Sequence, residues 1–278
     1  MNALEYRHIT KHYGSFCLED LSLQLPQGMI LGIVGENGAG KTTALKILLG
    51  RVLPDEGEVS LLGESNPRDN KLLRERIGTV MEEAGLPPIL KVKEIGNVLK
   101  RMYQTYDEEV FRRFTEGKHV DMDRPYGELS KGNKMKVSIA CAMSHHPDLL
   151  IFDEATSGLD PLARDELLDD LLDFTRDETH SVVLSSHIVS DLEKACDYIA
   201  FLHEGKLLLA EEKDVLKEQY VRIHVSNEAA ESYKSDSIFG KRITPYGTDL
   251  IVRREAADEG EPVSIEDLFI FMARKENA

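Results

Sequence analysis

Basic residues are too few in this chain for a general nucleic-acid-binding protein. It has 34 lysines and arginines against 50 aspartates and glutamates, a formal net charge of −16. The phosphates of DNA or RNA would repel so acidic a chain, and only a local basic patch would offset this. We therefore expect no nucleic-acid partner.

Cysteines and long apolar stretches are also scarce. Cys17, Cys141 and Cys196 are isolated, odd in number and without metal-site spacing, which fits a reducing cytosol and packing roles. No uninterrupted apolar stretch is long enough to cross a bilayer, and the first residues lack a signal-peptide pattern. If a membrane is involved, we expect a partner chain to supply the span.

What remains is an ordinary globular composition. The 278 residues are 41% hydrophobic and 30% charged. This length suits one large domain, or a domain of about 200 residues followed by a smaller one.

One segment carries most of the functional information. Residues 35–42 read GENGAGKT, which matches the G-x-x-x-x-G-K-T phosphate-binding loop of nucleotide triphosphatases. The apolar run at 29–34 predicts a buried strand before the loop, and residues 41–49 predict a helix after it. Glycines let the loop turn tightly, and the N–H groups at the helix start form an anion cradle. This strand–loop–helix context argues against a chance match.

The residue types in this loop suit a triphosphate that carries Mg²⁺. Lys41 would reach the β- and γ-phosphates, and the Thr42 hydroxyl would ligate the metal. The residues that we expect to contact ATP are Gly35, Asn37, Gly38, Ala39, Gly40, Lys41, Thr42 and Thr43.

A second motif supplies the carboxylates that the loop lacks. Residues 149–154 read LLIFDE, an apolar strand that ends in two acidic residues. Asp153 is placed to hold Mg²⁺, often through water, and Glu154 to polarise the attacking water. Without the phosphate loop, the two acidic residues would only mark the end of a strand.

The rest of the chain alternates strand and helix patterns, which implies an α/β core with parallel strand pairing. Residues 92–128 look mainly helical, with breaks at Pro125 and Gly127. Ser264 and Asp267 fit a capping box at the start of a last helix. The other predicted features are short strands and turns over 1–28, strands at 57–63, 182–184, 220–225 and 249–252, and a hairpin at 203–205.

From Leu4 to about Ala210, the order of these motifs resembles the ATP-binding subunit of an ABC transporter. The residues at the family's further motif positions are Tyr13 (adenine-stacking aromatic), Glu82 (Q-loop), Ser130 and Gly132 (signature motif), Asp160 (D-loop) and His187 (switch histidine). In isolation, Tyr13 would be interpreted as a core aromatic. The resemblance implies that His187 contacts the γ-phosphate and acts with Glu154 in catalysis.

Two departures from the family pattern stand out. Glu82 replaces the usual glutamine, and a carboxylate there still offers an oxygen to Mg²⁺ or water. Lys131 and Asn133 replace a glycine and a glutamine of the signature. Similar variants occur in bacterial drug- and peptide-export subunits of the ABC-2 type, and residues 83–88 resemble that group's connection to its helical subdomain.

The resemblance implies a P-loop NTPase fold with a mainly parallel, RecA-like sheet. It also implies an N-terminal antiparallel β subdomain, a helical subdomain at about 83–145 and a small α+β appendage. The ATP-binding domain would span 1–214 and the appendage 215–278.

The expected function is ATP hydrolysis that powers a membrane exporter, with ATP and Mg²⁺ as cofactors. Two such domains would close head-to-tail, so that Ser130 and Gly132 contact the γ-phosphate on the opposing Lys41. The partners would be a multi-span membrane subunit and a second ATPase, identical or paralogous, at the cytoplasmic face of the plasma membrane.

Two other classes compete with an exporter subunit. A soluble ABC-type clamp on ribosomes or DNA would carry two ATPase domains or a long coiled coil, and residues 43–148 show no sustained heptads. A P-loop kinase would explain Lys41 and Asp153 but not the later motifs. The cargo stays open, as does the choice between a homodimer and a heterodimer.

Overall fold

A parallel sheet forms the centre of the molecule. The computed structural model describes residues 1–65, 67–81, 85–233, 237–257 and 259–276. The parallel strands, in spatial order, are β9 (Tyr198–His203), β3 (Ile30–Val34), β8 (Ser181–Ser186), β7 (Leu149–Asp153) and β6 (Ile77–Val80). Three of them, β3, β7 and β8, are buried along their whole length, as strands covered on both faces must be.

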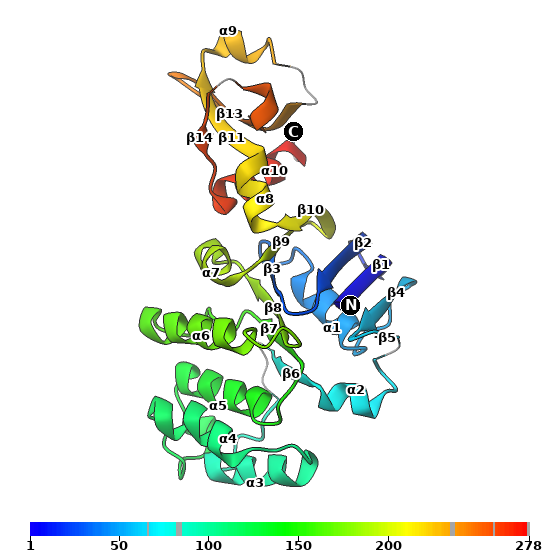
Figure 1. The fold of residues 1–278 in the computed structure, drawn as a ribbon, viewed down its shortest axis with the longest axis vertical. Coiled ribbons are helices and arrows are strands. Elements are labelled where there is room, and N and C mark those ends of the chain that lie inside the picture. Colours follow the sequence, from blue (N-terminus) through cyan, green and yellow to red (C-terminus); the bar gives the residue numbers. More distant parts are fainter. Residues whose placement is uncertain (66, 82–84, 234–236, 258, 277–278) are drawn as a thin grey trace.

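Antiparallel strands extend this sheet on the β9 side (Figure 1). They are β1 (Asn2–Tyr13), β2 (Phe16–Pro26), β4 (Glu56–Leu61), β5 (Glu64–Ser65) and β10 (Lys206–Glu212). β10 pairs antiparallel with β9 and meets β2 in parallel at a single position, Lys206 opposite Glu19. Among the described residues the order is β5-β4-β1-β2-β10-β9-β3-β8-β7-β6.

Alternate residues of β7 enter two different apolar cores. Leu149 and Ile151 belong to the core formed with α1 (Lys41–Leu48) and the antiparallel strands, whereas Leu150 and Phe152 belong to the core on the opposite face. Helices that contribute to this second core include α5 (Lys131–Met143), α6 (Pro161–Phe174) and α7 (Val189–Ala195).

A helical segment follows β6. Its elements are α3 (Val92–Met102), α4 (Glu108–Phe114), the short 3₁₀ helices η1 (Glu116–Lys118) and η2 (Tyr126–Glu128), and α5; the short α2 (Lys71–Glu75) precedes β6. Buried Phe111 and Phe114 anchor α4 in the second core. Pro125 caps η2, so the chain is not helical through the predicted break.

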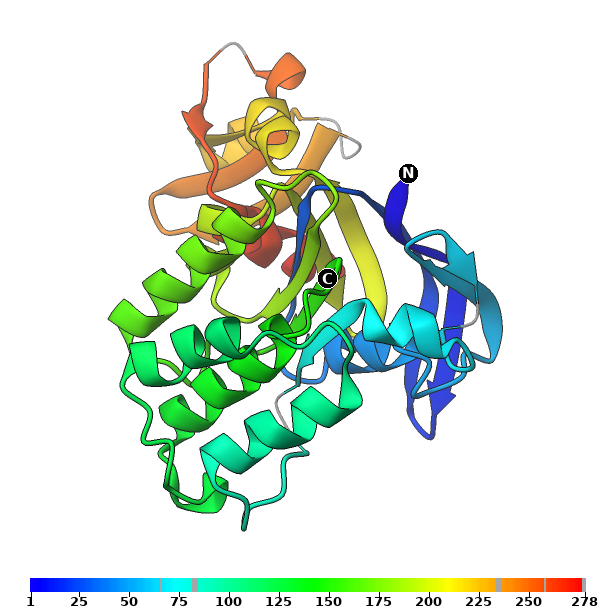
Figure 2. The same cartoon turned by 60° about the horizontal axis from the view of Figure 1, so that its bottom comes forward.

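The last part of the chain forms a second, smaller sheet. Its strands, in the order β12-β13-β11-β14, are β12 (Ile238–Thr244), β13 (Gly247–Arg253), β11 (Tyr220–Val225) and β14 (Glu261–Pro262). The accompanying helices are α8 (Lys213–Gln219), α9 (Asn227–Ala230), η4 (Arg254–Ala256) and α10 (Ile265–Glu276). Figure 2 shows this sheet (orange) at the opposite end of the molecule from α3 and α4 (green).

The second sheet is not detached from the first. α10 contacts both β12 and α7. The ring of Phe269 on α10 lies 5.6 Å from that of Phe201 on β9, centroid to centroid. As predicted, Ser264 accepts a hydrogen bond from the Asp267 backbone N–H at the start of α10.

The predicted fold class is confirmed: a mainly parallel core, an antiparallel β subdomain, a helical segment and a small α+β region. One predicted strand is shorter than expected. β4 ends at Leu61 rather than at residue 63, because residues 62 and 63 both have positive φ and turn the chain into β5. The division between 214 and 215 falls inside α8 and stays a prediction.

The predicted hairpin joins β9 to β10 through a two-residue turn. Glu204 and Gly205 have φ of 46° and 82°, the backbone of a tight turn that suits the twist of paired strands. A Cβ atom at Gly205 would overlap the carbonyl oxygen of Cys17 in the neighbouring β2.

Gly205→Ala should therefore lower the free energy of unfolding more than the matched change Gly14→Ala. Gly14 also has positive φ, 56°, but a Cβ there would meet no atom within 4 Å. Both changes carry the cost of about 1 kcal/mol for alanine in the left-handed region, and only Gly205→Ala adds a backbone clash. Urea denaturation of both variants measures the difference. Equal losses of stability would contradict it.

Candidate functional site

The predicted phosphate loop connects β3 to α1. Gly40 precedes the first residue of α1 and has φ of 106°, which allows the loop to turn directly into the helix. No side chain caps this helix start. Its backbone N–H groups are therefore available to an anion, and the helix dipole adds to the attraction.

Lys41, the first residue of α1, is buried at the base of the loop. Its Nζ atom donates hydrogen bonds to the backbone carbonyls of Gly35 at 2.6 Å and Glu36 at 3.2 Å. It also lies 3.0 Å from Glu154 Oε1, in an ion pair that lacks the alignment of a hydrogen bond. A phosphate oxygen brought to the loop would compete with Glu154 for this ammonium group.

Thr42 and Asp153 meet across the gap between α1 and β7. The Thr42 hydroxyl donates to Asp153 Oδ2 at 2.8 Å, and the Ser185 hydroxyl donates to Oδ1 of the same carboxylate at 2.7 Å. The structure thus brings together two of the three oxygen ligands that the sequence predicts for Mg²⁺, and the third, Glu82, is not described. Hard oxygen donors of this kind are those that the ion prefers.

Ser185 is a residue that the sequence analysis missed. It stands opposite Asp153 in the parallel pairing of β7 with β8. The only sequence signal is its place in the Ser-Ser-His end of a buried strand, and the register of two strands decides what it contacts.

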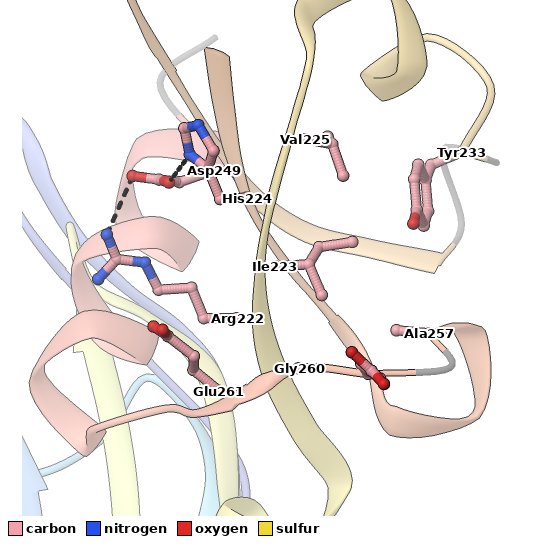
Figure 3. Close-up of a pocket in the computed structure, with 10 residues that line it drawn as sticks. Arg222, Ile223, His224, Val225, Tyr233, Asp249, Ala257, Gly260 and Glu261 are labelled. Atoms are coloured by element: carbon pink, nitrogen blue, oxygen red, sulfur yellow. Dashed lines mark hydrogen bonds and ion pairs between the residues drawn. The ribbon is translucent and has the colours of Figure 1, made fainter. Parts of the chain in front are cut away.

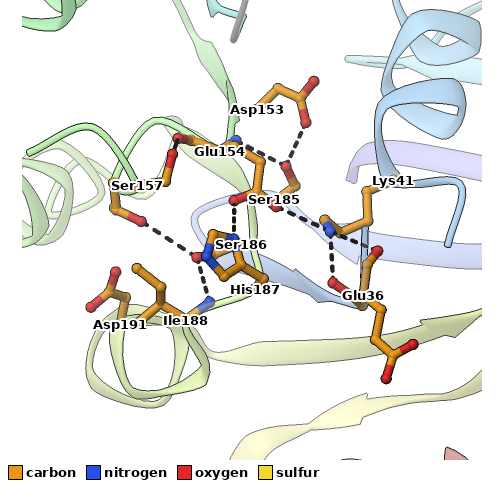
Figure 4. Close-up of polar contacts among 12 residues, drawn as sticks. Glu36, Lys41, Asp153, Glu154, Ser157, Ser185, Ser186, His187, Ile188 and Asp191 are labelled. Atoms are coloured by element: carbon orange, nitrogen blue, oxygen red, sulfur yellow. Dashed lines mark hydrogen bonds and ion pairs between the residues drawn. The ribbon is translucent and has the colours of Figure 1, made fainter. Parts of the chain in front are cut away.

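Glu154 lies between two basic groups (Figure 4). Its backbone has φ of 53°, and its N–H donates to the Ser185 hydroxyl at 3.2 Å. His187 Nδ1 lies 2.7 Å from Glu154 Oε2, while Lys41 approaches the other oxygen. A carboxylate accepts hydrogen bonds, so this contact places the imidazole proton on Nδ1 and leaves Nε2 for another group.

A cavity of about 750 Å³ opens beside these residues. Its lining residues are Tyr13, Phe16, Glu36, Asn37, Gly38, Gly40, Lys41, Thr42, Thr43, Lys46, Val52 and Glu154. Tyr13 is 45% exposed, so it is not the core aromatic that the residue alone would suggest. Phe16, which pairs with Tyr13 across the β1–β2 hairpin, is a second aromatic that the sequence analysis missed.

The signature and D-loop residues lie elsewhere. Ser130 caps α5 by accepting from the Asn133 N–H at 3.2 Å, and Asp160 caps α6 by accepting from the Ala163 N–H at 3.0 Å. The latter hydrogen bond lowers the pKa of the Asp160 carboxyl. Of the described residues, none from 130–132 or 160 lines the cavity. Glu82 lies outside the described residues.

A second cavity, of about 760 Å³, lies at the small sheet (Figure 3). Arg222 and His224 both bind the carboxylate of Asp249, at 3.0 Å and 2.8 Å, and the hydrogen bond to Asp249 raises the pKa of His224. Residues of the phosphate loop line the first cavity and are absent from the lining of this one, so the nucleotide chemistry belongs to the first cavity.

The comparison with known families agrees with this geometry. The family model described as ABC transporter matches residues 18–157. The chain belongs to the ABC transporter family. The bacitracin transport ATP-binding protein of Bacillus licheniformis is 32% identical over 226 residues, which cover 79% of this chain and 74% of that protein. The lantibiotic transport ATP-binding protein of Streptococcus pyogenes is 33% identical over 213 residues, or 76% and 91%.

Solved structures give the same result. A structure of an ATP-binding subunit of an ABC transporter is 27% identical, with a TM-score of 0.67 over 77% of this chain and 92% of that one. A dimeric bacterial ABC transporter cassette, at 22% identity, has a TM-score of 0.68 over 76% and 98%, and supports the fold alone. This ABC protein is therefore an ATP-binding subunit of the ATPase class. Among the described residues, no helix is long and apolar enough to cross a membrane.

Lys41→Ala should weaken ATP binding by about one to two orders of magnitude, because charge-assisted hydrogen bonds to phosphate are each worth roughly 1.5–3 kcal/mol. Isothermal titration calorimetry measures the affinity. Lys71→Ala is the control, since Lys71 is exposed and contacts Glu75 within α2. Unchanged affinity in Lys41→Ala would exclude the predicted role.

Proposed function

We propose that this subunit hydrolyses Mg-ATP to power a membrane exporter, through ATP-driven closure of a dimer. The observation that carries the proposal is the convergence of Lys41, Thr42, Asp153, Glu154 and His187 from three separate segments beside one cavity, which Lys41, Thr42 and Glu154 line. Phosphoryl transfer to water needs this set: a cation and a metal for the phosphates, and a base that orients the nucleophile.

Each residue has a distinct role in this proposal. Thr42 and Asp153 would hold Mg²⁺, which neutralises phosphate charge when bound, with Glu82 as a third oxygen ligand. Glu154 would orient and polarise the attacking water. His187, with a proton on Nε2 as well as on Nδ1, would donate from Nε2 to the γ-phosphate. Tyr13 would stack on the adenine.

The site is completed by a second ATPase domain. Ser130 and Gly132 lie at the start of α5, where helix N–H groups suit an anion, yet they do not line the cavity of their own chain. We propose that they and Asp160 close over the nucleotide of an opposing subunit and exclude water from the γ-phosphate. Either a second copy or a paralogue would fill this role.

A multi-span membrane subunit is the proposed second partner. Ile89 is 82% exposed, and Val98 and Met102 project from one face of α3. Exposed apolar side chains close together in sequence favour a protein contact, and this segment follows Glu82 in the sequence. We propose that a cytoplasmic segment of the membrane subunit docks here, which places the chain at the cytoplasmic face of the plasma membrane.

Export is supported over a clamp on ribosomes or DNA. The relatives are named for transport of bacitracin and of lantibiotics, and for export of Nod factor. The acidic charge of the chain agrees, since nucleic acid would be repelled. Residues 1–214 would carry the ATPase and 215–278 a supporting appendage, and the cargo stays unassigned.

Glu154→Gln should bind ATP and hydrolyse it at least about a hundredfold more slowly, because an amide cannot act as the base. The variant should accumulate as a closed, ATP-bound dimer. Single-turnover hydrolysis and size-exclusion chromatography with ATP measure the two effects. Glu128→Gln, an exposed change outside the site, is the control. Hydrolysis by Glu154→Gln at a near-parental rate would refute the assignment.

Mixing Lys41→Ala with Ser130→Arg should restore hydrolysis that neither variant shows alone. In mixed dimers one composite site retains both its Lys41 and its opposing Ser130. Equimolar mixing should recover up to about a quarter of the parental rate, since half of the dimers are mixed and each has one intact site. Hydrolysis that stays absent while the chains demonstrably dimerise would rule out a composite site between two copies.

A further inference from the structure

A buried ion pair connects α6 to α7 outside the nucleotide cavity. Arg164 Nε lies 3.7 Å from Asp191 Oδ2, and the side chains are 25% and 7% exposed. Neither atom has a hydrogen-bond partner among the described residues. The contact is therefore mainly electrostatic, in a place where water is largely absent.

The pair lies between the two loops that lead into these helices. Arg164 Nη2 reaches back to the Leu159 carbonyl at 3.5 Å, in the loop that ends at Asp160. On the other helix, the Asp191 N–H donates to the Ile188 carbonyl at 3.2 Å, and the Ile188 N–H donates to the Ser186 hydroxyl at 3.0 Å. Ile188, which directly follows His187, is thus hydrogen-bonded to the Asp191 backbone and to the Ser186 side chain.

A second contact joins the same loops nearer the sheet. The hydroxyls of Thr156 and Ser186 lie 3.4 Å apart. The Ser157 hydroxyl donates to the Glu154 carbonyl at 2.8 Å. Figure 4 shows the contacts of Glu154 with Ser157 and His187 and of Ser186 with Ile188, and draws Asp191 beside Ile188. A shift of the D-loop relative to the switch histidine would therefore break both the Arg164–Asp191 ion pair and the contact between the Thr156 and Ser186 hydroxyls.

Fold stability alone does not explain the pair. The desolvation of two buried charges offsets much of their attraction, and apolar replacements of both partners are often neutral or stabilising. What two such charges add is a defined relative position of the elements that carry them.

We propose that Arg164 and Asp191 are positioning residues that hold His187 against Glu154 and couple its position to the D-loop. This inference rests on the proposed function, in which Asp160 belongs to the contact between subunits and His187 to the hydrolytic site. Closure of the dimer around the D-loop would then set the switch histidine of the same subunit.

The decisive variant replaces both partners, Arg164→Met with Asp191→Leu. A purely structural role predicts that both the melting temperature and the activity return to parental levels. The positioning role predicts a near-parental melting temperature, an unchanged KM for ATP, and a kcat lowered by about tenfold, in the usual range for coupling between sites. Each single variant should melt at a lower temperature, since it leaves one buried charge unpaired. Arg164→Lys, which keeps the charge, should recover much of kcat relative to Arg164→Met.

Lys194→Met is the matched control on the same two helices. Lys194 on α7 pairs with Asp165 at 2.5 Å and Asp169 at 3.3 Å on α6, and all three side chains are exposed. Loss of an exposed pair should change neither kcat nor the melting temperature measurably. If Lys194→Met lowers kcat as much as the double variant, general helix contact and not the buried pair is responsible.

A measurement that does not depend on hydrolysis separates this inference from the proposed function. The imidazole ¹⁵N shifts of His187, assigned with His187→Gln, should show a proton held on Nδ1 in the parent. The double variant should show a mixture of tautomers, because the contact with Glu154 is loosened. Parental shifts in the double variant would overturn the inference even if the chain hydrolyses ATP, and loss of the tautomer signature would support it even if the chain does not.

Discussion

The register of three parallel strands decides where the chemistry of this molecule lies. Val34 pairs with Ser186 and Asp153 pairs with Ser185, so β3, β8 and β7 end at the same edge of the sheet. The phosphate loop, the two carboxylates and His187 all follow these strand ends. A slip of one residue in β7 would turn the Asp153 side chain to the other face of the sheet and away from Thr42.

Glu154 lies where the arrangement of these strand ends brings one acidic and two basic side chains together. Its carboxylate is nearly buried between Lys41 and His187, and its backbone adopts a conformation that is uncommon for a residue with a side chain. Such strain is tolerated where surrounding contacts hold it, here the two hydrogen bonds from its N–H to Ser185. The Glu154 carboxylate contacts both Lys41 and His187. A ligand that draws Lys41 away from Glu154 would therefore change the charge that His187 faces.

The sequence was sufficient for the local parts of this site. Glycine spacing predicts the phosphate loop, and an apolar run that ends in Asp153 and Glu154 predicts a strand with two carboxylates at its end. Contacts set by strand or helix pairing could not be predicted: Phe16 opposite Tyr13, Ser185 beneath Asp153, and Arg164 against Asp191. Each depends on which elements become neighbours, and a single sequence contains no period that reveals this. Ser130 and Gly132 illustrate a different limit. Their proposed contact is with the nucleotide of a second subunit, which neither the sequence nor the structure of a single chain contains.

The apolar core beneath α10 has a consequence for how the protein unfolds. One continuous cluster of buried side chains runs from Phe111 in the helical segment, through Phe152 and Leu192, to Leu268 and Phe269 in the last helix. Removing the C-terminal region would expose the apolar surface that it covers on α7 and β9. Unfolding of α10 should therefore destabilise α7 and β9, even though the ends of the sequence belong to two different sheets.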